Sequence, residues 1–203
     1  MKIIETKLKD CYIIEPAVFN DERGYFMEFY SDEKMDKARS VLPKVVQGNR
    51  SFSKKGTLRG LHYQKGDTAQ AKLVECLQGA VLDVAVDLRK DSPSYKEWIS
   101  VELTANNHRQ LLIPKGFAHG FLTLEDNTLF QYLVDYPYSP TTEGGFLWSD
   151  KEINVDWQFE KYGITHVILY KNAKVRMIID ETEPENYNKI YSDNNFVIYE
   201  IVK

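Results

Sequence analysis

Apolar and polar residues alternate along much of the chain, in short runs that predict β-strands. The clearest run covers residues 80–88. One of its faces is apolar throughout, and the other mixes small apolar residues with two aspartates. The first face carries Leu82, Val84, Val86 and Leu88, and the second carries Val81, Asp83, Ala85 and Asp87. Because successive side chains of a strand point to opposite faces, this pattern predicts a strand with two different sides.

Similar runs predict further strands, each rich in β-branched or aromatic residues. They cover residues 72–77, 98–103, 110–113, 128–135, 164–170, 174–179 and 196–202. Gln78-Gly79 is typical of a turn between two of them, and residues 171–173 are typical of a second hairpin turn. Many short strands separated by turns favour an all-β sandwich or barrel.

One segment has the pattern of a helix. Ser31 is a suitable N-cap, and Asp32 and Glu33 suit the positive end of the helix dipole. The helical pattern continues to about Val41, and Pro43 limits it.

Length and composition narrow the class of protein. A chain of 203 residues fits one domain with a small appendage. Its net charge of -4 and its lack of a dense basic block argue against nucleic-acid binding. Cys11 and Cys76 lie far apart, which predicts buried free thiols rather than a disulfide or a zinc site. No apolar run approaches the ~20 residues of a membrane helix, and no secretion signal is present, so we expect a cytoplasmic protein without membrane contact.

Residues 58–63 place two reactive side chains three positions apart. His62 can take or give a proton near neutral pH, and Arg59 can hold a phosphate with two hydrogen bonds. Gly60 lies between them and permits a bulge or a close backbone approach. These residues alone favour the alternative interpretation, a structural histidine beside a surface arginine.

Other residues suggest a pocket without proving one. His119 lies among small residues at the start of an apolar run, where it can pack in a core or line a cavity. The segment 130–140 is rich in Tyr, whose phenol can act as an acid and whose ring can stack on a base. The four histidines are scattered, so the sequence argues against a metal site.

Taken together, eight segments resemble the dTDP-4-dehydrorhamnose 3,5-epimerase family, and they follow the family order over residues 1–157. They are FNDERGYFME at 19–28, QGN at 47–49, LRGLHYQ at 58–64, AKLV at 71–74, DVAVDLR at 83–89, IPKGFAHGF at 113–121, YSP at 138–140 and LWSD at 147–150. One such motif is weak, whereas eight in order make a chance resemblance improbable.

The resemblance implies an all-β, cupin-type jelly-roll barrel, with the short helix in its N-terminal half, that forms a homodimer. It implies a nucleotide-linked 4-keto-6-deoxy hexose as substrate and no metal or redox cofactor. A hydrogen beside a ketone is weakly acidic, so a base can remove it and an acid can return a proton to the opposite face. That inverts the carbon without a redox change.

The resemblance also implies roles for individual residues. It implies that His62 is the base, that Tyr132 is the acid and that Lys72 stabilises the enolate oxygen. Residues with an implied role in substrate binding are Arg23, Glu28, Gln47, Asn49, Arg59, His119, Tyr138 and Glu143. Among these, the arginines suit the diphosphate and Tyr138 suits stacking.

The C-terminal part departs from the family. Members continue beyond the Trp157 position into a Leu-Ser-x-Lys-Asp segment, whose Asp orients the catalytic His and whose Lys touches the substrate. Here residues 158–171 contain no Asp. Asp180 can take its place through a rebuilt tail, Asp83 can take over, or the pair is lost. We expect a jelly-roll epimerase domain at 1–157 and an atypical extension at 158–203, packed on that domain or at the dimer interface.

The altered tail leaves two other functions open. A changed pocket wall can restrict the reaction to one carbon, which gives a 3- or 5-epimerase or a keto-sugar isomerase. A sugar-nucleotide binding protein without catalysis is the third hypothesis, since a fold does not determine a function.

Overall fold

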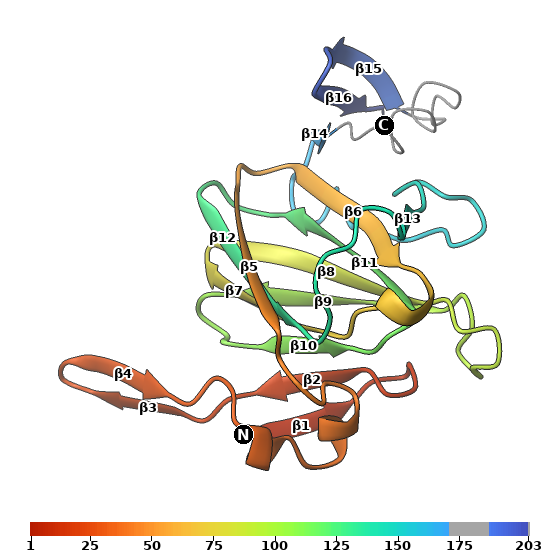
Figure 1. Ribbon diagram of the computed structural model, residues 1–203. Coiled ribbons are helices and arrows are strands. Elements are labelled where there is room, and N and C mark those ends of the chain that lie inside the picture. The colour runs from red at the N-terminus through yellow and green to blue at the C-terminus, as the bar shows by residue number, and fades with distance from the viewer. Residues whose placement is uncertain (171–186, 203) are drawn as a thin grey trace.

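The computed structural model describes residues 1–170 and 187–202. These residues form two large β-sheets packed face to face and one small hairpin (Figure 1). The prediction of an all-β fold is confirmed. Within the described residues, no helix is long and apolar enough to cross a membrane.

The first sheet has six strands in the order β1-β2-β10-β7-β12-β5. Their bounds are β1 (Lys2–Glu5), β2 (Tyr12–Glu15), β10 (Gln110–Ile113), β7 (Lys72–Gln78), β12 (Thr128–Val134) and β5 (Gln47–Ser53). All neighbours in this sheet are antiparallel. Strands predicted at 72–77, 110–113 and 128–135 are confirmed here, with ends that differ by no more than one residue.

The second sheet has eight strands in the order β15-β16-β14-β6-β11-β8-β9, with β13 beside β6. Their bounds are β15 (Tyr187–Ser192), β16 (Phe196–Ile201), β14 (His166–Tyr170), β6 (Thr57–Gln64), β11 (Phe117–Thr123), β8 (Ala80–Asp87), β9 (Trp98–Thr104) and β13 (Glu143–Gly145). The start of β6 pairs with β14, and its end pairs with β13. Two separate segments therefore share one edge of β6.

Each side of strand β8, which lies between β11 and β9, is covered by a different hydrophobic core. Val81 and Ala85 face the other sheet and pack with Phe121 and Phe130 between the two layers. Leu82, Val84 and Val86 face outward, into a second core that includes Trp148, Trp157 and the tail. The alternation predicted for residues 80–88 is confirmed, and all eight residues of β8 are buried.

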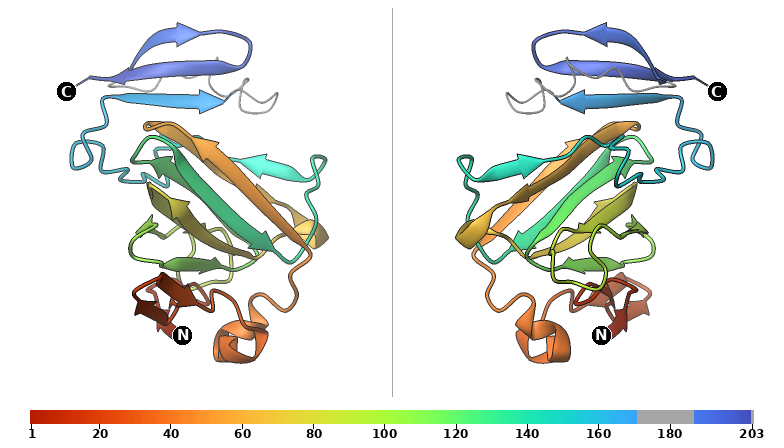
Figure 2. Two further views of the ribbon diagram at one scale, coloured as in Figure 1. Left: turned by 90° about the vertical axis from the view of Figure 1, so that its left-hand side faces the viewer. Right: turned by 90° about the vertical axis from the view of Figure 1, so that its right-hand side faces the viewer.

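The tail strands extend the second sheet rather than standing apart from it. Figure 2 shows β14, β15 and β16 at the end of the molecule opposite to the N-terminal strands. Val167 and Leu169 of β14, and Val197 and Tyr199 of β16, are buried against Leu58 of β6 and its neighbours. The strand expected at 164–170 begins at His166, and β15 was not predicted because its segment is polar. The strand expected at 174–179 and the turn at 171–173 lie outside the described residues, and the division at residue 157 stays a prediction.

The N-terminal half adds a hairpin and short helical turns. Strands β3 (Val18–Asp21) and β4 (Gly24–Met27) form a two-stranded hairpin that projects from the body (Figure 1). The expected helix is a 3₁₀ helix, η1 (Asp32–Ser40), and a second short one is η2 (Gly66–Thr68). Ser31 occupies the N-cap position, but its side chain makes no capping hydrogen bond, so that part of the prediction is wrong.

Candidate active site

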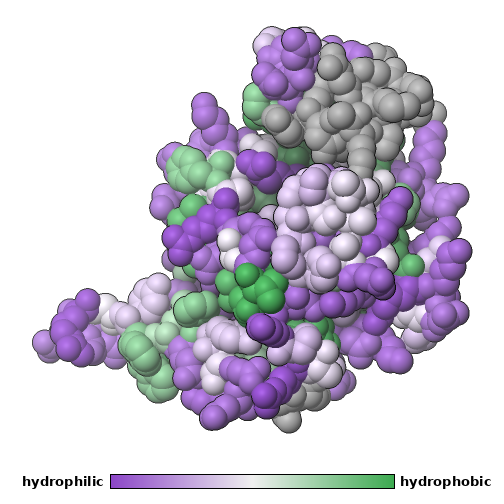
Figure 3. Space-filling model, viewed as in Figure 1, coloured by the Kyte–Doolittle hydropathy of each residue, from purple (hydrophilic) through white to green (hydrophobic). Residues whose placement is uncertain are grey.

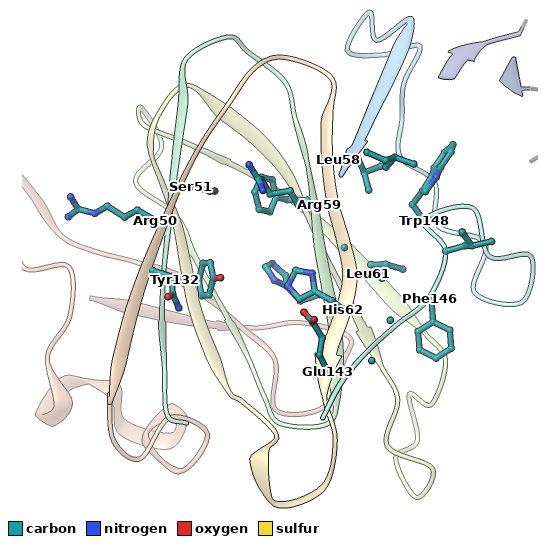
Figure 4. A pocket seen from close by; sticks show the side chains of 18 residues that line it. Arg50, Ser51, Leu58, Arg59, Leu61, His62, Tyr132, Glu143, Phe146 and Trp148 are labelled. Atoms are coloured by element: carbon teal, nitrogen blue, oxygen red, sulfur yellow. The ribbon is translucent and has the colours of Figure 1, made fainter. Parts of the chain in front are cut away.

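A cavity of about 420 Å³ opens between the two sheets. Strand β5, with β12 beside it, forms one wall, and β6 with β11 forms the other. Figure 4 shows Arg59, His62, Tyr132 and Glu143 on one side of β6, and Leu58 and Trp148 on the other. A volume of this size, with a few polar groups converging on it, suits a small ligand.

Strand β5 lines the cavity with polar residues. In the sequence QGNRSFS, inward-facing and exposed positions alternate, and Asn49, Ser51 and Ser53 face inward. A strand that is polar on its inward face lines a cavity rather than a packed core. Ser53 Oγ accepts hydrogen bonds from Arg59 Nε and Nη2 at 3.3 Å each, which holds the guanidinium at the cavity wall. The alternation in β5 is visible in the sequence, but it was not among the features predicted for the site.

His62 and Tyr132 face each other across the cavity. His62 comes from β6 and Tyr132 from β12, so the two side chains belong to opposite sheets (Figure 4). The ammonium of Lys72, which is only 5% exposed, lies 6.0 Å from the centroid of the Tyr132 ring. The three residues with implied catalytic roles are therefore close together.

Burial shifts the pKa values of His62, Lys72 and Tyr132 in directions that suit proton transfer. The pKa of His62 is lowered well below its usual value by burial and by the charge of Lys72, so the ring is neutral and has a free lone pair. Burial lowers the pKa of Lys72 to about 8, which leaves it mostly charged at neutral pH. Burial raises the pKa of Tyr132, so its phenol keeps a proton to donate. A neutral base and a protonated acid thus line one cavity, with a cation close to the acid.

Asp83 does not bond to His62. Its Oδ2 lies 2.9 Å from His119 Nε2, and both side chains are buried. The reason is the strand order: β11, which carries His119, lies between β6 and β8. With strands ~4.8 Å apart, Asp83 meets the middle strand first. In the described part of the chain no carboxylate hydrogen-bonds to His62, and Asp180 lies outside the described residues.

The pair formed by Asp83 and His119 adds a second buried ionisable unit to the cavity wall. Burial raises the pKa of Asp83, and the nearby Lys72 opposes that shift. Burial lowers the pKa of His119, which makes its ring neutral. The rings of His119 and His62 meet edge to face, with centroids 5.9 Å apart. His119 therefore lines the cavity, with its ring held by Asp83, and its role in substrate binding stays a prediction.

Hydrogen bonds join four more predicted residues at the mouth of the cavity, where Asn49 and Glu143 belong to its lining and Gln47 and Tyr138 are bonded to them. Gln47 Nε2 donates to Asn49 Oδ1 at 2.8 Å, and Tyr138 Oη donates to Glu143 Oε2 at 3.1 Å. Gln47 Oε1 also accepts a hydrogen bond from the backbone N–H of Tyr138 at 3.0 Å. These bonds link β5, β13 and the intervening loop around the opening.

Two predicted binding residues lie away from this cavity. Arg23 is in the turn of the β3–β4 hairpin, where it pairs with Asp21. Glu28 follows β4 and pairs with Lys34. Neither lines the cavity. Several lining residues were given no role from the sequence. They are Arg50, Ser51, Leu58, Leu61, Phe121, Gly144, Gly145, Phe146, Leu147, Trp148 and Leu169.

No metal centre is found in the described residues, among which no three His, Cys, Asp or Glu side chains gather as possible ligands. The two cysteines are free and buried, as expected.

Comparisons with known proteins agree with one another. A family model described as dTDP-4-dehydrorhamnose 3,5-epimerase matches residues 5–179. A protein of that name from Salmonella typhimurium is 48% identical over 161 residues, which cover 79% of this chain and 88% of the relative. In addition, 118 chains of solved structures match this fold.

Two of these solved structures bear on the ligand. A 3,5-epimerase from Legionella pneumophila, in complex with dTDP-4-keto-L-rhamnose, is 42% identical with a TM-score of 0.73, and the match covers 77% of this chain and 82% of that one. A 3′-monoepimerase from Streptomyces bikiniensis, in complex with dTDP-quinovose, is 27% identical with a TM-score of 0.76, covering 86% and 85%. The likeness confirms the cupin-type jelly roll.

Proposed function

The chain belongs to the dTDP-4-dehydrorhamnose 3,5-epimerase family, and on this premise we propose that it converts dTDP-4-dehydro-6-deoxy-D-glucose into dTDP-4-dehydro-L-rhamnose. It is an isomerase of deoxysugar biosynthesis. The relatives are 3,5-epimerases at 48% and 51% identity, whereas the 3′-monoepimerase is 27% identical, which favours inversion at both carbons.

The reaction begins with proton removal beside the ketone. His62 takes the proton from carbon 3, the C–H electron pair forms the enolate double bond, and the carbonyl electrons move to the oxygen at carbon 4. The low pKa of His62 supports this role, because the ring is unprotonated at neutral pH. The buried ammonium of Lys72 is suited to stabilise the negative oxygen.

The reaction ends with protonation from the opposite face. Tyr132 donates its phenolic proton to the carbon, the enolate collapses to the ketone, and the configuration is inverted. Proton exchange with water then returns the imidazolium to imidazole and the phenolate to phenol. With both groups reset, the same two steps at carbon 5 complete the second inversion, and a further exchange with water restores the enzyme, so that no atom or electron is gained or lost overall.

One observation carries this proposal. His62 and Tyr132 come from opposite sheets and face each other across a cavity, with the buried ammonium of Lys72 6.0 Å from the Tyr132 ring. A base and an acid on opposite sides of a substrate are what inversion of a carbon requires.

The test is proton exchange in heavy water. Purified protein is incubated with dTDP-4-keto-6-deoxyglucose, carbons 3 and 5 are followed by proton NMR, and the product is trapped with a 4-keto reductase. We expect both proton signals to be lost and a rhamnose-type product to form. Exchange at carbon 3 alone would identify a single-carbon epimerase. Binding without any exchange would leave a sugar-nucleotide binding protein.

We also propose a homodimer in which each hairpin completes the partner's site. The β3–β4 hairpin exposes large apolar side chains, with Phe19 62%, Tyr25 58% and Phe26 70% exposed. It projects from the body, with apolar surface near its base (Figures 1 and 3). Exposed apolar patches of this kind often form protein–protein interfaces, and a second copy of the chain can bury this one in a symmetric dimer. Arg23 and Glu28 would then reach the cavity of the other subunit.

Mixed dimers test this arrangement. R23A and H62N should each be nearly inactive alone, but mixing them through co-expression should restore about a quarter of the wild-type sites. The reason is that half of the dimers are mixed, and each of these has one site with both native residues. Activity of the separately tagged, co-purified mixed dimer is the measurement, and in this purified species half of the sites should be active.

The control uses two residues from one chain's cavity. H62N mixed with Y132F should recover no activity, because every site then keeps one defect. If R23A and H62N also fail to complement each other, Arg23 acts within its own subunit or not at all.

We place the enzyme in the cytoplasm, because nucleotide-linked sugars are made there from nucleoside triphosphates. Its proposed partners are this substrate and a second copy of the chain.

A further inference from the structure

Gln64 lies at the end of β6, two residues after His62, and has no role in the reaction described above. Its side chain is only 6% exposed. A buried amide must have its hydrogen bonds satisfied, and each of the bonds it makes constrains a neighbour. The partners of Gln64 therefore show what this residue holds in place.

The Gln64 amide bonds to both neighbours of Tyr138 in the chain. Its Nε2 donates to the carbonyl of Pro137 at 3.2 Å and to that of Thr68 at 2.7 Å. Its Oε1 accepts from the backbone N–H of Ser139 at 2.8 Å. One side chain thus binds the backbone on both sides of the residue at the tip of the loop.

The rest of the loop is held at its two ends. At the start, the backbone N–H of Ala71 donates to Asp135 Oδ1 at 2.8 Å. At the end, the backbone N–H of Lys65 donates to the carbonyl of Thr142 at 3.0 Å, and the hydroxyls of Thr68 and Thr142 lie 2.6 Å apart. These bonds close the loop but do not set the position of its tip.

Tyr138 itself sits exposed at the mouth of the cavity, with 54% of its surface accessible. Its hydroxyl donates to Glu143 Oε2 at 3.1 Å, and the place from which the ring starts is set by its backbone. Gln47 of β5 holds its N–H from one side of the opening, and Gln64 of β6 holds its neighbours from the other. The tip of the loop is thus tied to both walls of the cavity.

We propose that Gln64 is a positioning residue, which sets the Tyr138 ring so that it stacks on the base of the nucleotide sugar. This inference rests on the proposed function and on the stacking role that the family resemblance implies for Tyr138. Gln64 and His62 share strand β6. The backbone of this strand therefore helps to set the positions of both the Tyr138 ring and the catalytic base, His62.

The test is a double-mutant cycle between Gln64 and Tyr138. Q64L removes all three bonds, and Q64E keeps the acceptor but cannot donate, so two variants of different polarity are available. We expect each to raise KM, and the Kd for dTDP, about tenfold, as for the loss of a stacked base, with kcat within about twofold. In a Y138A background, neither substitution should have a further effect.

Gln70 offers a matched control. Its Nε2 donates to the carbonyl of Tyr136 at 2.7 Å, so it touches the same loop from a more exposed position away from the tip. Q70L should leave KM and the dTDP affinity within about twofold of wild type.

Three outcomes contradict the proposal. If Q64L lowers the dTDP affinity as much in the Y138A background as in the wild type, Gln64 acts independently of the Tyr138 ring. A fall in kcat with unchanged KM, or a lower Tm with unchanged dTDP affinity, would leave a structural role alone. Calorimetry with dTDP does not depend on turnover. An inactive wild type would therefore overturn the proposed reaction, while the binding cycle would still decide the role of Gln64.

Discussion

The H62N variant is expected to lose deuterium exchange at carbons 3 and 5 by about 10³-fold or more, while its Kd for dTDP stays within a few fold of wild type. General base catalysis contributes roughly 10²–10⁴-fold, and an amide cannot accept a proton at neutral pH. Asparagine is smaller than histidine but keeps a planar, polar, hydrogen-bonding group at this position, so the substitution removes the base without placing a charge there. Heavy-water NMR measures the exchange, and calorimetry measures the binding.

The control for this variant is H166N, since His166 lies exposed on β14 away from the cavity. It should exchange both protons at the wild-type rate. Exchange by H62N at more than about a tenth of that rate would show that another group is the base. The nearest alternative is His119, whose ring centroid is 5.9 Å from that of His62.

The K72M variant is expected to be more stable and far less active. Burial lowers the pKa of Lys72 from 10.5 to about 8. A depression of that size corresponds to about 3 kcal/mol at neutral pH, to order of magnitude. Methionine removes this penalty, so we expect a Tm several degrees higher at pH 7. It also removes the cation that stabilises the enolate oxygen, so kcat should fall by about 10²-fold or more.

The burial of Lys72 should also make the stability of the wild type depend on pH. The folded protein gives up the Lys72 proton at about pH 8, and the unfolded chain does so near 10.5. Between these values the unfolded state binds more protons, so the stability of the wild type should rise with pH in that window. K72M should lack this contribution. In the wild type, kcat should fall as pH rises through about 8, because the ammonium is lost.

K55M is a suitable control, since Lys55 is exposed. It should change neither the stability at pH 7 nor kcat. If K72M is instead less stable than wild type at pH 7 and keeps the same rise with pH, Lys72 is not the buried cation of this site.

Some features of the active site were predicted from the sequence, and others were not. The motif around His62 predicted a base and a phosphate ligand, and the structure places both side chains on the cavity wall. The partner of Asp83 could not be obtained in this way. It depends on which strand lies between β6 and β8, and pairing between strands distant in sequence is not encoded in any local pattern.

The β3–β4 hairpin and the mouth of the cavity also could not be interpreted from the sequence alone. Arg23 was assigned to the nucleotide, but a sequence does not say whether a residue reaches its own cavity or that of a second copy. Gln64 belongs to one of the family motifs, but the sequence assigned it no role. Its three hydrogen-bond partners lie on two loops, which come beside β6 only when the chain folds.

The sequence by itself determined the all-β class, the position of most central strands and the types of residue available for proton transfer. These depend on alternation, turn residues and side-chain chemistry, which are local. Only the tertiary structure decided that both faces of β8 are buried, that the tail supplies the outer cover, and that His119 rather than His62 binds Asp83. Alternation reveals that a strand has two faces, but what covers each face depends on segments brought together only when the chain folds.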